Sequence, residues 1–294
     1  MEKTGTTTIQ EFLFQNRNEL LEQGLYFPVD ELGKNNRAIF DLFSNSNNVG
    51  SLGFINNDVK RKLDLMLKCI FARDENIILT TEYLSSRLYE LEDIKKLKDY
   101  LLNFKRELIV IVYIREPTSF FESSYQECCK DIETMKFNEF VDKCLNDKHE
   151  LKYLNFSNRY DYESILAKWR NVFGRIIVKK FEPNLMVKND LLFDFASTID
   201  IDDNKLEIVS SKNTGLTLNY IIGMRIFNRL FKKLLLKKKK SSLIFKVSIV
   251  LKTIVHIFLT RIFHSGAKAS CLKSKSLDES SKIKKVRTYY NSLS

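Results

Sequence analysis

The residues best suited to bind a ligand or to take part in a reaction lie at the start of the sequence, in the segment Lys-Thr-Gly-Thr-Thr-Thr. They are Lys3, Thr4, Gly5, Thr6, Thr7 and Thr8. A helical pattern follows from Ile9 to Gln23, so this loop is expected to open into a helix. The N–H groups at a helix N-terminus have no partner within the helix and carry the positive end of its dipole. Such a turn binds phosphate-like anions, for which Gly5 permits a tight backbone and Lys3 supplies a positive charge.

An ordinary helix cap is the alternative for the same residues. Thr7 or Thr8 would then cap a helix that begins at Ile9, with Glu11 as the partner in a capping box. The order of residues excludes a Walker A loop, because that loop ends in Gly-Lys-Ser/Thr and the chain contains no such sequence.

A second group of candidate residues follows residues 108–114, an apolar stretch with the pattern of a buried strand. Arg115, Glu116 and Pro117 come directly after it, and Ser123 lies eight residues beyond Arg115. The alternative for these residues is a helix cap together with a surface ion pair between Arg115 and a neighbouring glutamate.

Together the two motifs resemble the donor-binding motifs of sulfotransferases that use 3′-phosphoadenylyl sulfate (PAPS), in particular the bacterial and glycan-modifying branch. The first is similar to the loop that binds the 5′-phosphosulfate, and the second to the motif that binds the 3′-phosphate. The resemblance covers residues 1–230 and implies a P-loop-NTPase-like α/β fold, with a parallel β-sheet flanked by helices. Members of the family carry an apolar strand before the loop, where this chain has Met1 and Glu2. We therefore expect that this first strand is missing and that Met1 is an internal methionine of a longer protein.

The resemblance also implies roles for the candidate residues in moving a sulfuryl group from PAPS to a hydroxyl of a carbohydrate. Residues 4–8 would hold the 5′-phosphosulfate, and Arg115 and Ser123 would bind the 3′-phosphate. Lys3 would stabilise the charge on the leaving oxygen. Glu82, at the carboxyl end of a predicted strand, is the candidate general base. The alternatives for Glu82 are a surface carboxylate and a residue that positions Lys3 or Arg115, and no metal is required because the cationic side chains supply the charge.

Apolar periodicity along the chain indicates alternating helices and strands, as in a parallel α/β sheet. The strands are predicted at 76–81, 108–114 and 176–178, with residues 25–28 at the sheet edge. The helices are predicted at 58–72, 84–102, 120–129, 137–145, 159–173 and 190–199, and from residue 218 onward. Residues 33–57 read as a long loop with helical content near 38–43.

The C-terminal part has a different composition. Lysine runs at 232–233 and 237–240 precede the apolar-rich segment 243–263, which carries too many charges for a helix that spans a membrane. Lys246, Lys252, His256 and Arg261 fall on one half of a helical wheel, which favours a basic amphipathic helix on an anionic membrane, through residues 237–263. A core or dimer helix with lysines at its rim is the alternative. The predicted organisation is a sulfotransferase-like domain at 1–236, the amphipathic helix at 237–264 and a flexible or short-helical C-terminus at 265–294.

Composition narrows the class of partner. The net charge of +11 over 294 residues indicates an anionic partner, and the lysine-rich tail lacks the interleaved aromatic residues of a nucleic-acid site. The five cysteines show no metal-binding spacing and fit a reducing compartment, so we expect a cytoplasmic protein, peripheral at the inner face of the membrane. The alternative function is a catalytically inactive, truncated sulfotransferase-like protein that binds glycan or membrane.

Overall fold

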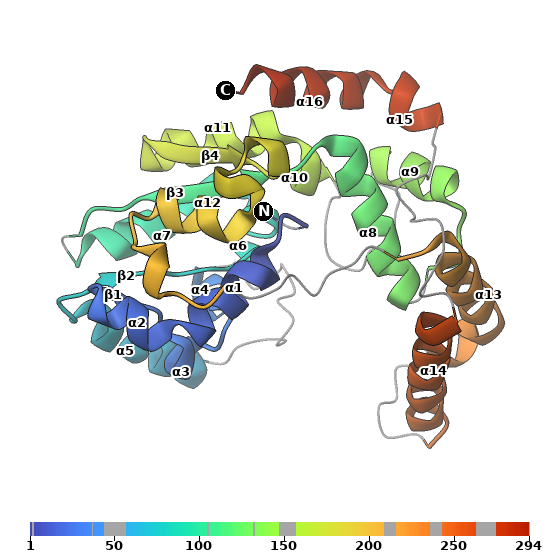
Figure 1. Cartoon of the computed structure of the whole chain (residues 1–294), viewed down its shortest axis with the longest axis horizontal. Helices are drawn as coiled ribbons and strands as arrows, with labels where there is room; N and C mark the ends of the chain where they lie inside the picture. The colour runs from blue at the N-terminus through green and yellow to red at the C-terminus, as the bar shows by residue number, and fades with distance from the viewer. Residues whose placement is uncertain are drawn as a thin grey trace. The chain divides into compact units, whose positions relative to one another are not determined.

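The computed structural model describes residues 1–294 except 2, 37, 44–56, 105, 132, 147–156, 209–215, 236–242, 263–274 and 294. The described chain is mixed α/β, as predicted, and it is mostly helical (Figure 1). Its described strands form two small parallel sheets and not the single sheet that the resemblance implies. It forms two compact units that do not follow the order of the sequence. Unit 1 contains residues 1–116, 150–212 and 286–294, and unit 2 contains residues 117–149 and 213–285.

Unit 1 holds two parallel two-stranded sheets. In the first, β1 (Leu25–Tyr26) pairs with β2 (Asn76–Ile77). In the second, β3 (Val110–Ile114) pairs with β4 (Ile176–Lys180) over five residues of each strand. All three strands and the sheet edge expected from the sequence are thus present, although β2 is much shorter than residues 76–81.

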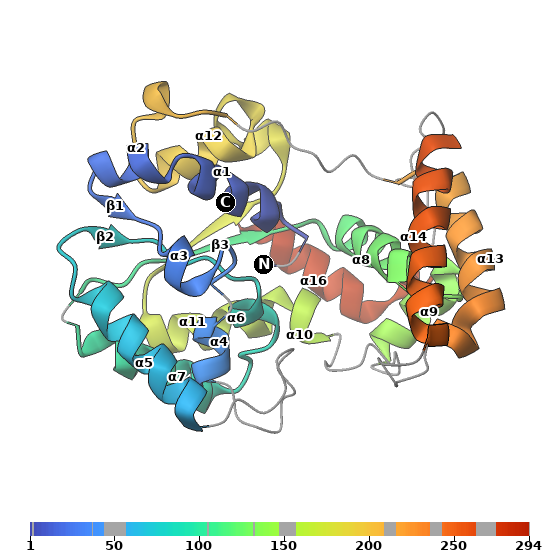
Figure 2. The ribbon, with the colours of Figure 1, turned by 90° about the horizontal axis from the view of Figure 1, so that it is seen from below.

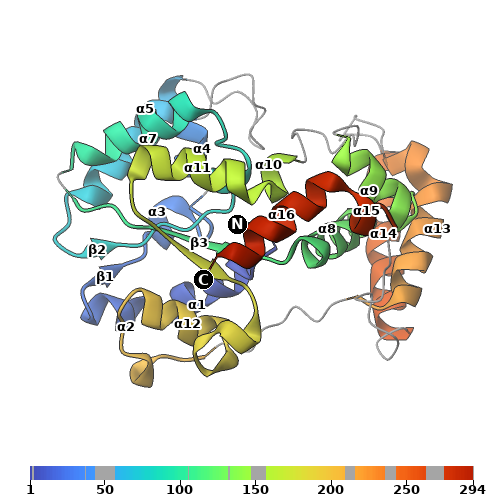
Figure 3. The same cartoon turned by 90° about the horizontal axis from the view of Figure 1, so that it is seen from above.

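Alternate side chains of these strands enter two different parts of the core, because successive side chains of a strand point to opposite faces. Leu25, Ile78 and Ile111 belong to the first cluster. Its helices are α1 (Thr6–Gln15), α2 (Arg17–Glu22) and α12 (Leu191–Thr198). Tyr26, Ile77 and Val110 belong to the second cluster. Its helices are α4 (Ala38–Phe43), α5 (Asn57–Phe71), α7 (Leu91–Leu102) and α11 (Tyr162–Phe173). Figures 2 and 3 show the strands of unit 1 lying between these two groups of helices.

The single helix predicted from Ile9 to Gln23 is wrong, because the structure contains two helices and the first begins earlier, at Thr6. Asn16 separates them. Its side-chain amide donates to the carbonyls of Phe12 and Glu207, each at 2.9 Å, and accepts from the N–H of Glu207 at 2.7 Å. Asparagine side chains compete with helical hydrogen bonds in this way, so the chain turns at this buried residue.

The helix predicted at 84–102 is likewise two helices, α6 (Tyr83–Ser86) and α7, with residues 87–90 between them. The remaining elements of unit 1 are short. They are α3 (Val29–Leu32), α10 (Ser157–Tyr160), and the 3-10 turns η1 (Pro183–Leu185), η2 (Val187–Asn189) and η3 (Asp203–Lys205).

The described elements of unit 2 are helices, with short non-helical segments between some of them. Its elements are α8 (Pro117–Asp131), α9 (Phe137–Leu145), α13 (Leu218–Leu235), α14 (Leu243–Ile262) and α15 (Lys275–Glu279). The ring of Tyr125 lies 5.1 Å and 5.2 Å, between centroids, from the rings of Phe137 and Phe140. The buried Asn228 on α13 donates to the carbonyls of Cys129 and Glu133, which joins α13 to the end of α8. Among the described residues, no helix combines the length and the apolar character needed to cross a membrane.

The last helix, α16 (Ser281–Ser292), lies in the segment predicted as flexible or short-helical. Ile283, Val286 and Tyr290 are buried along one of its faces. From Val286 onward this helix belongs to unit 1, where the hydroxyl of Tyr290 donates to the Glu182 carboxylate at 2.5 Å. The last helix therefore contacts unit 1 next to β4, where Nζ of Lys180 also lies 5.2 Å from the ring centroid of Tyr290.

Candidate functional site

The predicted anion-binding loop forms the N-terminal turn of α1. Gly5 is the N-cap, with φ 76° and ψ 16°, and its carbonyl accepts the N–H groups of Thr8 at 2.9 Å and Ile9 at 3.1 Å. No side chain caps this helix, and within the described part of the chain the N–H groups of Thr6 and Thr7 have no hydrogen-bond partner. The alternative of an ordinary cap by Thr7 or Thr8 is therefore wrong. The turn keeps N–H donors of the kind that bind an anion.

Gly5 is fixed at this position by both its backbone and its surroundings. Its positive φ lies in the left-handed region that favours glycine. A Cβ atom here would stand 2.3 Å from Cδ2 of Leu191 and 3.0 Å from Cε2 of Phe181. The turn thus packs directly against the start of α12 and the residue that follows β4.

Two of the threonine hydroxyls bind the loop itself. The hydroxyl of the buried Thr4 donates to the carbonyl of Met1 at 2.5 Å and accepts from the Met1 nitrogen at 3.2 Å. The hydroxyl of Thr6 donates to the same carbonyl at 3.0 Å. These two side chains hold the shape of the turn, which leaves the hydroxyls of Thr7 and Thr8 as the candidates for contact with a ligand.

The structure brings the two predicted motifs together. Nη1 of Arg115, just past the end of β3, donates to the carbonyl of Lys3 at 3.0 Å. The hydroxyl of Tyr162 donates to the carbonyl of Arg115 at 2.7 Å, and burial raises the pKa of Tyr162, so this hydroxyl stays protonated. Lys3 itself has a φ of 61°, which is uncommon for a residue other than glycine. The arginine thus binds the loop at a residue with an unusual backbone conformation.

Met1, two residues before the loop, contacts β3. The Met1 nitrogen donates to the carbonyl of Tyr113 at 3.0 Å, whereas the carbonyl of Ile114 accepts from Phe181, beyond β4, at 2.7 Å. Successive carbonyls of a strand point to opposite edges. Met1 therefore lies at the edge of β3 that faces away from β4.

The other two predicted site residues lie elsewhere. Glu82 is the half-buried N-cap residue of α6, a few residues after β2, and its carbonyl accepts from Ser85 and Ser86. Ser123 lies within α8, in unit 2, whereas Arg115 is in unit 1. The proposed roles of Glu82 as a base and of Ser123 beside Arg115 stay predictions.

A polar cavity beside the loop was missed by the sequence analysis. It is lined by Thr7, Gln10, Glu11, Lys34 and Asn35. Lys34 binds the Glu11 carboxylate at 3.0 Å, and the side chain of Gln10 is buried with its Nε2 unpartnered among the described residues. Gln10, a polar residue directly after the apolar Ile9, could have indicated this cavity from the sequence.

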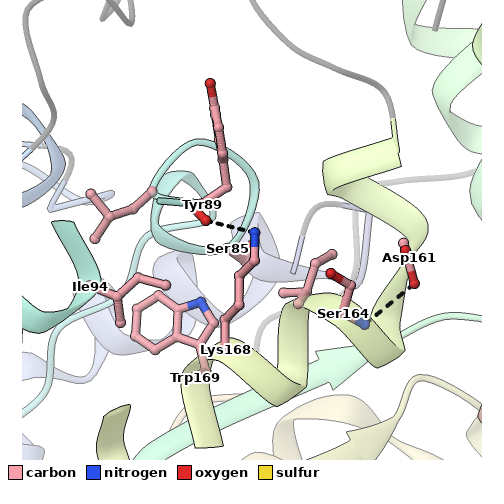
Figure 4. A pocket seen from close by; sticks show the side chains of 9 residues that line it. Ser85, Tyr89, Ile94, Asp161, Ser164, Lys168 and Trp169 are labelled. Atoms are coloured by element: carbon pink, nitrogen blue, oxygen red, sulfur yellow. Dashed lines mark hydrogen bonds between the residues drawn. The ribbon is translucent and has the colours of Figure 1, made fainter. Parts of the chain in front are cut away.

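A second cavity lies between α6, α7 and α11 (Figure 4). Ile94 and Trp169 form part of its wall. Nζ of Lys168 donates to the carbonyl of Tyr89 at 2.9 Å, and the Asp161 carboxylate caps α11 through the N–H of Ser164. These polar groups already bind the protein, so we assign this cavity no ligand.

Across the described ranges there is no group of three or more His, Cys, Asp or Glu side chains placed to hold a metal ion. Comparison of the chain with models of protein families, with curated proteins and with solved structures finds no match.

Proposed function

We propose that this chain is a PAPS-dependent sulfotransferase of the P-loop-like α/β class that acts on a hydroxyl of a carbohydrate. The observation that carries the proposal is the 3.0 Å contact between Arg115 and the carbonyl of Lys3, which joins two motifs that are far apart in the sequence. The loop also offers the unpartnered N–H groups of Thr6 and Thr7. A cluster of N–H donors and cationic side chains fits the charges of a phosphosulfate and a phosphate. The strands of unit 1, with helices on both faces, support the α/β class.

The bound donor would supply an activated sulfuryl group. The acceptor oxygen bonds to sulfur, the bond from sulfur to the bridging oxygen breaks, and the products are a sulfate ester and 3′,5′-adenosine bisphosphate. In this proposal Lys3 stabilises the negative charge that develops on the bridging oxygen, because a positive charge interacts more strongly with the more negative state. Glu82 accepts the proton of the acceptor hydroxyl.

We place the carbohydrate acceptor in the polar cavity beside α1. Thr7 and Gln10 lie about one helical turn apart, so a ligand in this cavity would be close to the turn that binds the donor. The unpartnered amide of Gln10 and the carboxylate of Glu11 are groups that bind hydroxyls. For the location, we propose the cytoplasm, at the inner face of an anionic membrane.

Calorimetric titration of 3′,5′-adenosine bisphosphate into the full chain tests the donor site. We expect micromolar binding, and Arg115→Ala should weaken it by about tenfold to 150-fold, the loss expected for one charge-assisted hydrogen bond. Arg17→Ala is the matched control, because it removes the same charge from the opposite end of α1, where Arg17 donates to the carbonyl of Phe14.

Two outcomes would contradict the donor site: a folded wild-type chain that binds no bisphosphate, or an Arg115→Ala variant that binds it as tightly as the wild type. Binding of bisphosphate without transfer from labelled PAPS to any carbohydrate in an acceptor screen would favour the inactive alternative.

A further inference from the structure

The helices α13 and α14 of unit 2 lie side by side, and their contacts fix which face of α14 points inward (Figure 1). Leu259 is buried against Gly223 of α13, and His256 is hydrogen-bonded to the hydroxyl of Tyr220. Lys252 forms an ion pair with Asp131 of α8 at 3.0 Å. Two basic residues that the sequence analysis placed on the water-facing side of this helix therefore face the protein.

The opposite face of α14 is exposed and mostly apolar. With Lys252 at 0° and about 100° per residue, His256 lies at about 40°, whereas Ile257, Val250 and Ile254 lie at about 140°, 160° and 200°. The exposed Arg261 lies among them, at about 180°. The exposed residues of this face are Val250, Ile254, Ile257, Phe258 and Ile262, each between 45% and 59% exposed. The helix thus turns Lys252 and His256 toward the protein, whereas its exposed side combines apolar residues with Arg261.

The helix α13 also carries a row of exposed apolar residues. Leu218, Ile222, Ile226 and Leu230 are exposed at every fourth position, and Leu230 is 73% exposed. The residues on the other side of this helix, Tyr220, Met224 and Phe227, are buried. We call the exposed residues of α13 and α14 together the outer apolar face.

The charge around this face identifies its occupant. Residues 208–277 contain no aspartate or glutamate, and lysines and arginines recur throughout them. Arg229 and Arg261 are exposed on the two helices that carry the face. A second copy of the chain would set these cations against cations, whereas an anionic lipid surface satisfies both the charges and the apolar side chains.

We infer that the outer apolar face inserts into the headgroup region of an anionic membrane, with α13 and α14 lying in the membrane plane. This inference deepens the proposed membrane location and does not depend on sulfuryl transfer. It adds α13 to the membrane-binding segment. It also assigns Lys252 to the side of α14 that faces the protein, where this residue pairs with Asp131.

Co-sedimentation of the full chain with phosphatidylcholine vesicles, with and without phosphatidylglycerol, tests this inference. We expect binding to the vesicles that contain phosphatidylglycerol, and the double variant Ile254→Ser with Phe258→Ser should weaken it by at least about tenfold, because two half-exposed apolar side chains no longer enter the lipid. The matched control is Val59→Ser with Leu65→Ser, which changes two similarly exposed apolar residues on α5. Circular dichroism of both double variants checks that they fold.

The inference is wrong if the folded wild-type chain stays in the supernatant with anionic vesicles, or if both double variants bind equally. A dimer in sedimentation equilibrium that is lost only in the Ile254→Ser with Phe258→Ser variant would assign the face to a second copy instead. Bisphosphate titration of the same preparations reports separately on the donor site, so failure of one proposal leaves the other intact.

Discussion

At the scale of single residues, Gly5 is required both for the left-handed backbone of the turn and for the close packing of the turn against Leu191 and Phe181. We expect Gly5→Ala to lower the free energy of unfolding by about 2–4 kcal/mol, because the new methyl group would add overpacking to the cost of a left-handed backbone. The overlap is with Leu191 Cδ2, at 2.3 Å from the position of the new carbon. Urea unfolding followed by circular dichroism measures the change.

Gly24 offers a matched control for this prediction. Its φ of 77° equals that of Gly5 within a degree, but a Cβ atom at Gly24 would meet nothing within 4 Å. Gly24→Ala should therefore show the backbone cost alone, about 1–2 kcal/mol. Equal losses in the two variants would mean that α12 moves to accommodate the methyl group.

Glu82, the N-cap residue of α6, is the proposed general base. If it is the general base, Glu82→Gln should lower turnover at saturating donor by about a hundredfold or more, with bisphosphate affinity unchanged. Single-turnover transfer from labelled PAPS measures this step. Unchanged turnover would remove Glu82 from the mechanism, and a rise in KM without a fall in kcat would indicate a positioning role.

The residue scale also shows where sequence reasoning reaches its limit. The types and order of residues 3–8, with the arginine after an apolar strand, were enough to predict an anion site. They did not reveal that the hydroxyls of Thr4 and Thr6 would bind the carbonyl of Met1. Nor could they show an unpartnered Gln10, because the orientation of an amide depends on neighbours such as Lys34 that loop geometry brings close.

At the scale of elements, apolar periodicity predicted most helices and strands, and helix 137–145 even to the residue. Periodicity failed to predict a helix boundary that depends on hydrogen bonds to a residue far away in the sequence. The break at Asn16 depends on hydrogen bonds to Glu207, which lies far along the chain, so no window of the first helix contains the signal. The C-terminal helix was readable from the spacing of Ile283, Val286 and Tyr290, but the lysines and serines around them obscured it.

The amphipathic helix α14 makes a related point about orientation. A helical wheel separates two faces, but it does not say which face meets the protein. Here Asp131 of α8 and Tyr220 of α13 provide partners for Lys252 and His256, so these two residues turn inward, whereas Arg261 stays exposed. Only the neighbouring helices carry this information, and it converts a general membrane prediction into a specific set of inserting residues.

At the scale of the whole molecule, the last described residues of the chain pack against residues of unit 1 that lie far away in the sequence. The ring of Tyr290 lies at a tilt beside that of Tyr162, with centroids 6.4 Å apart, and the hydroxyl of Tyr162 donates to the carbonyl of Arg115. Arg287 also forms an ion pair with Glu116 at 3.5 Å. The strand end that carries the proposed phosphate-binding arginine is thus supported by a helix far away in sequence.

The hydroxyl of Tyr290 tests this support. Tyr290→Phe should lower the free energy of unfolding by about 1–3 kcal/mol, because it leaves the Glu182 carboxylate without its donor. Tyr289→Phe is the control: it removes the neighbouring hydroxyl, which binds the exposed Arg170, and should change stability by less than about 0.5 kcal/mol.

Because of the Tyr290 hydroxyl, the difference in unfolding free energy between the wild type and Tyr290→Phe should also depend on pH. Burial, and then the hydrogen bond to Glu182, raise the pKa of Tyr290 above its ordinary value. A group whose pKa is higher in the folded state contributes its full stability below its unfolded pKa, here about 10, and loses it as the pH rises. The difference in unfolding free energy between the wild type and Tyr290→Phe should therefore be constant from neutral pH to about 9 and shrink above about 10. Urea unfolding across this range measures it, and a difference that grows with pH would show that Glu182 is not the partner of this hydroxyl in solution.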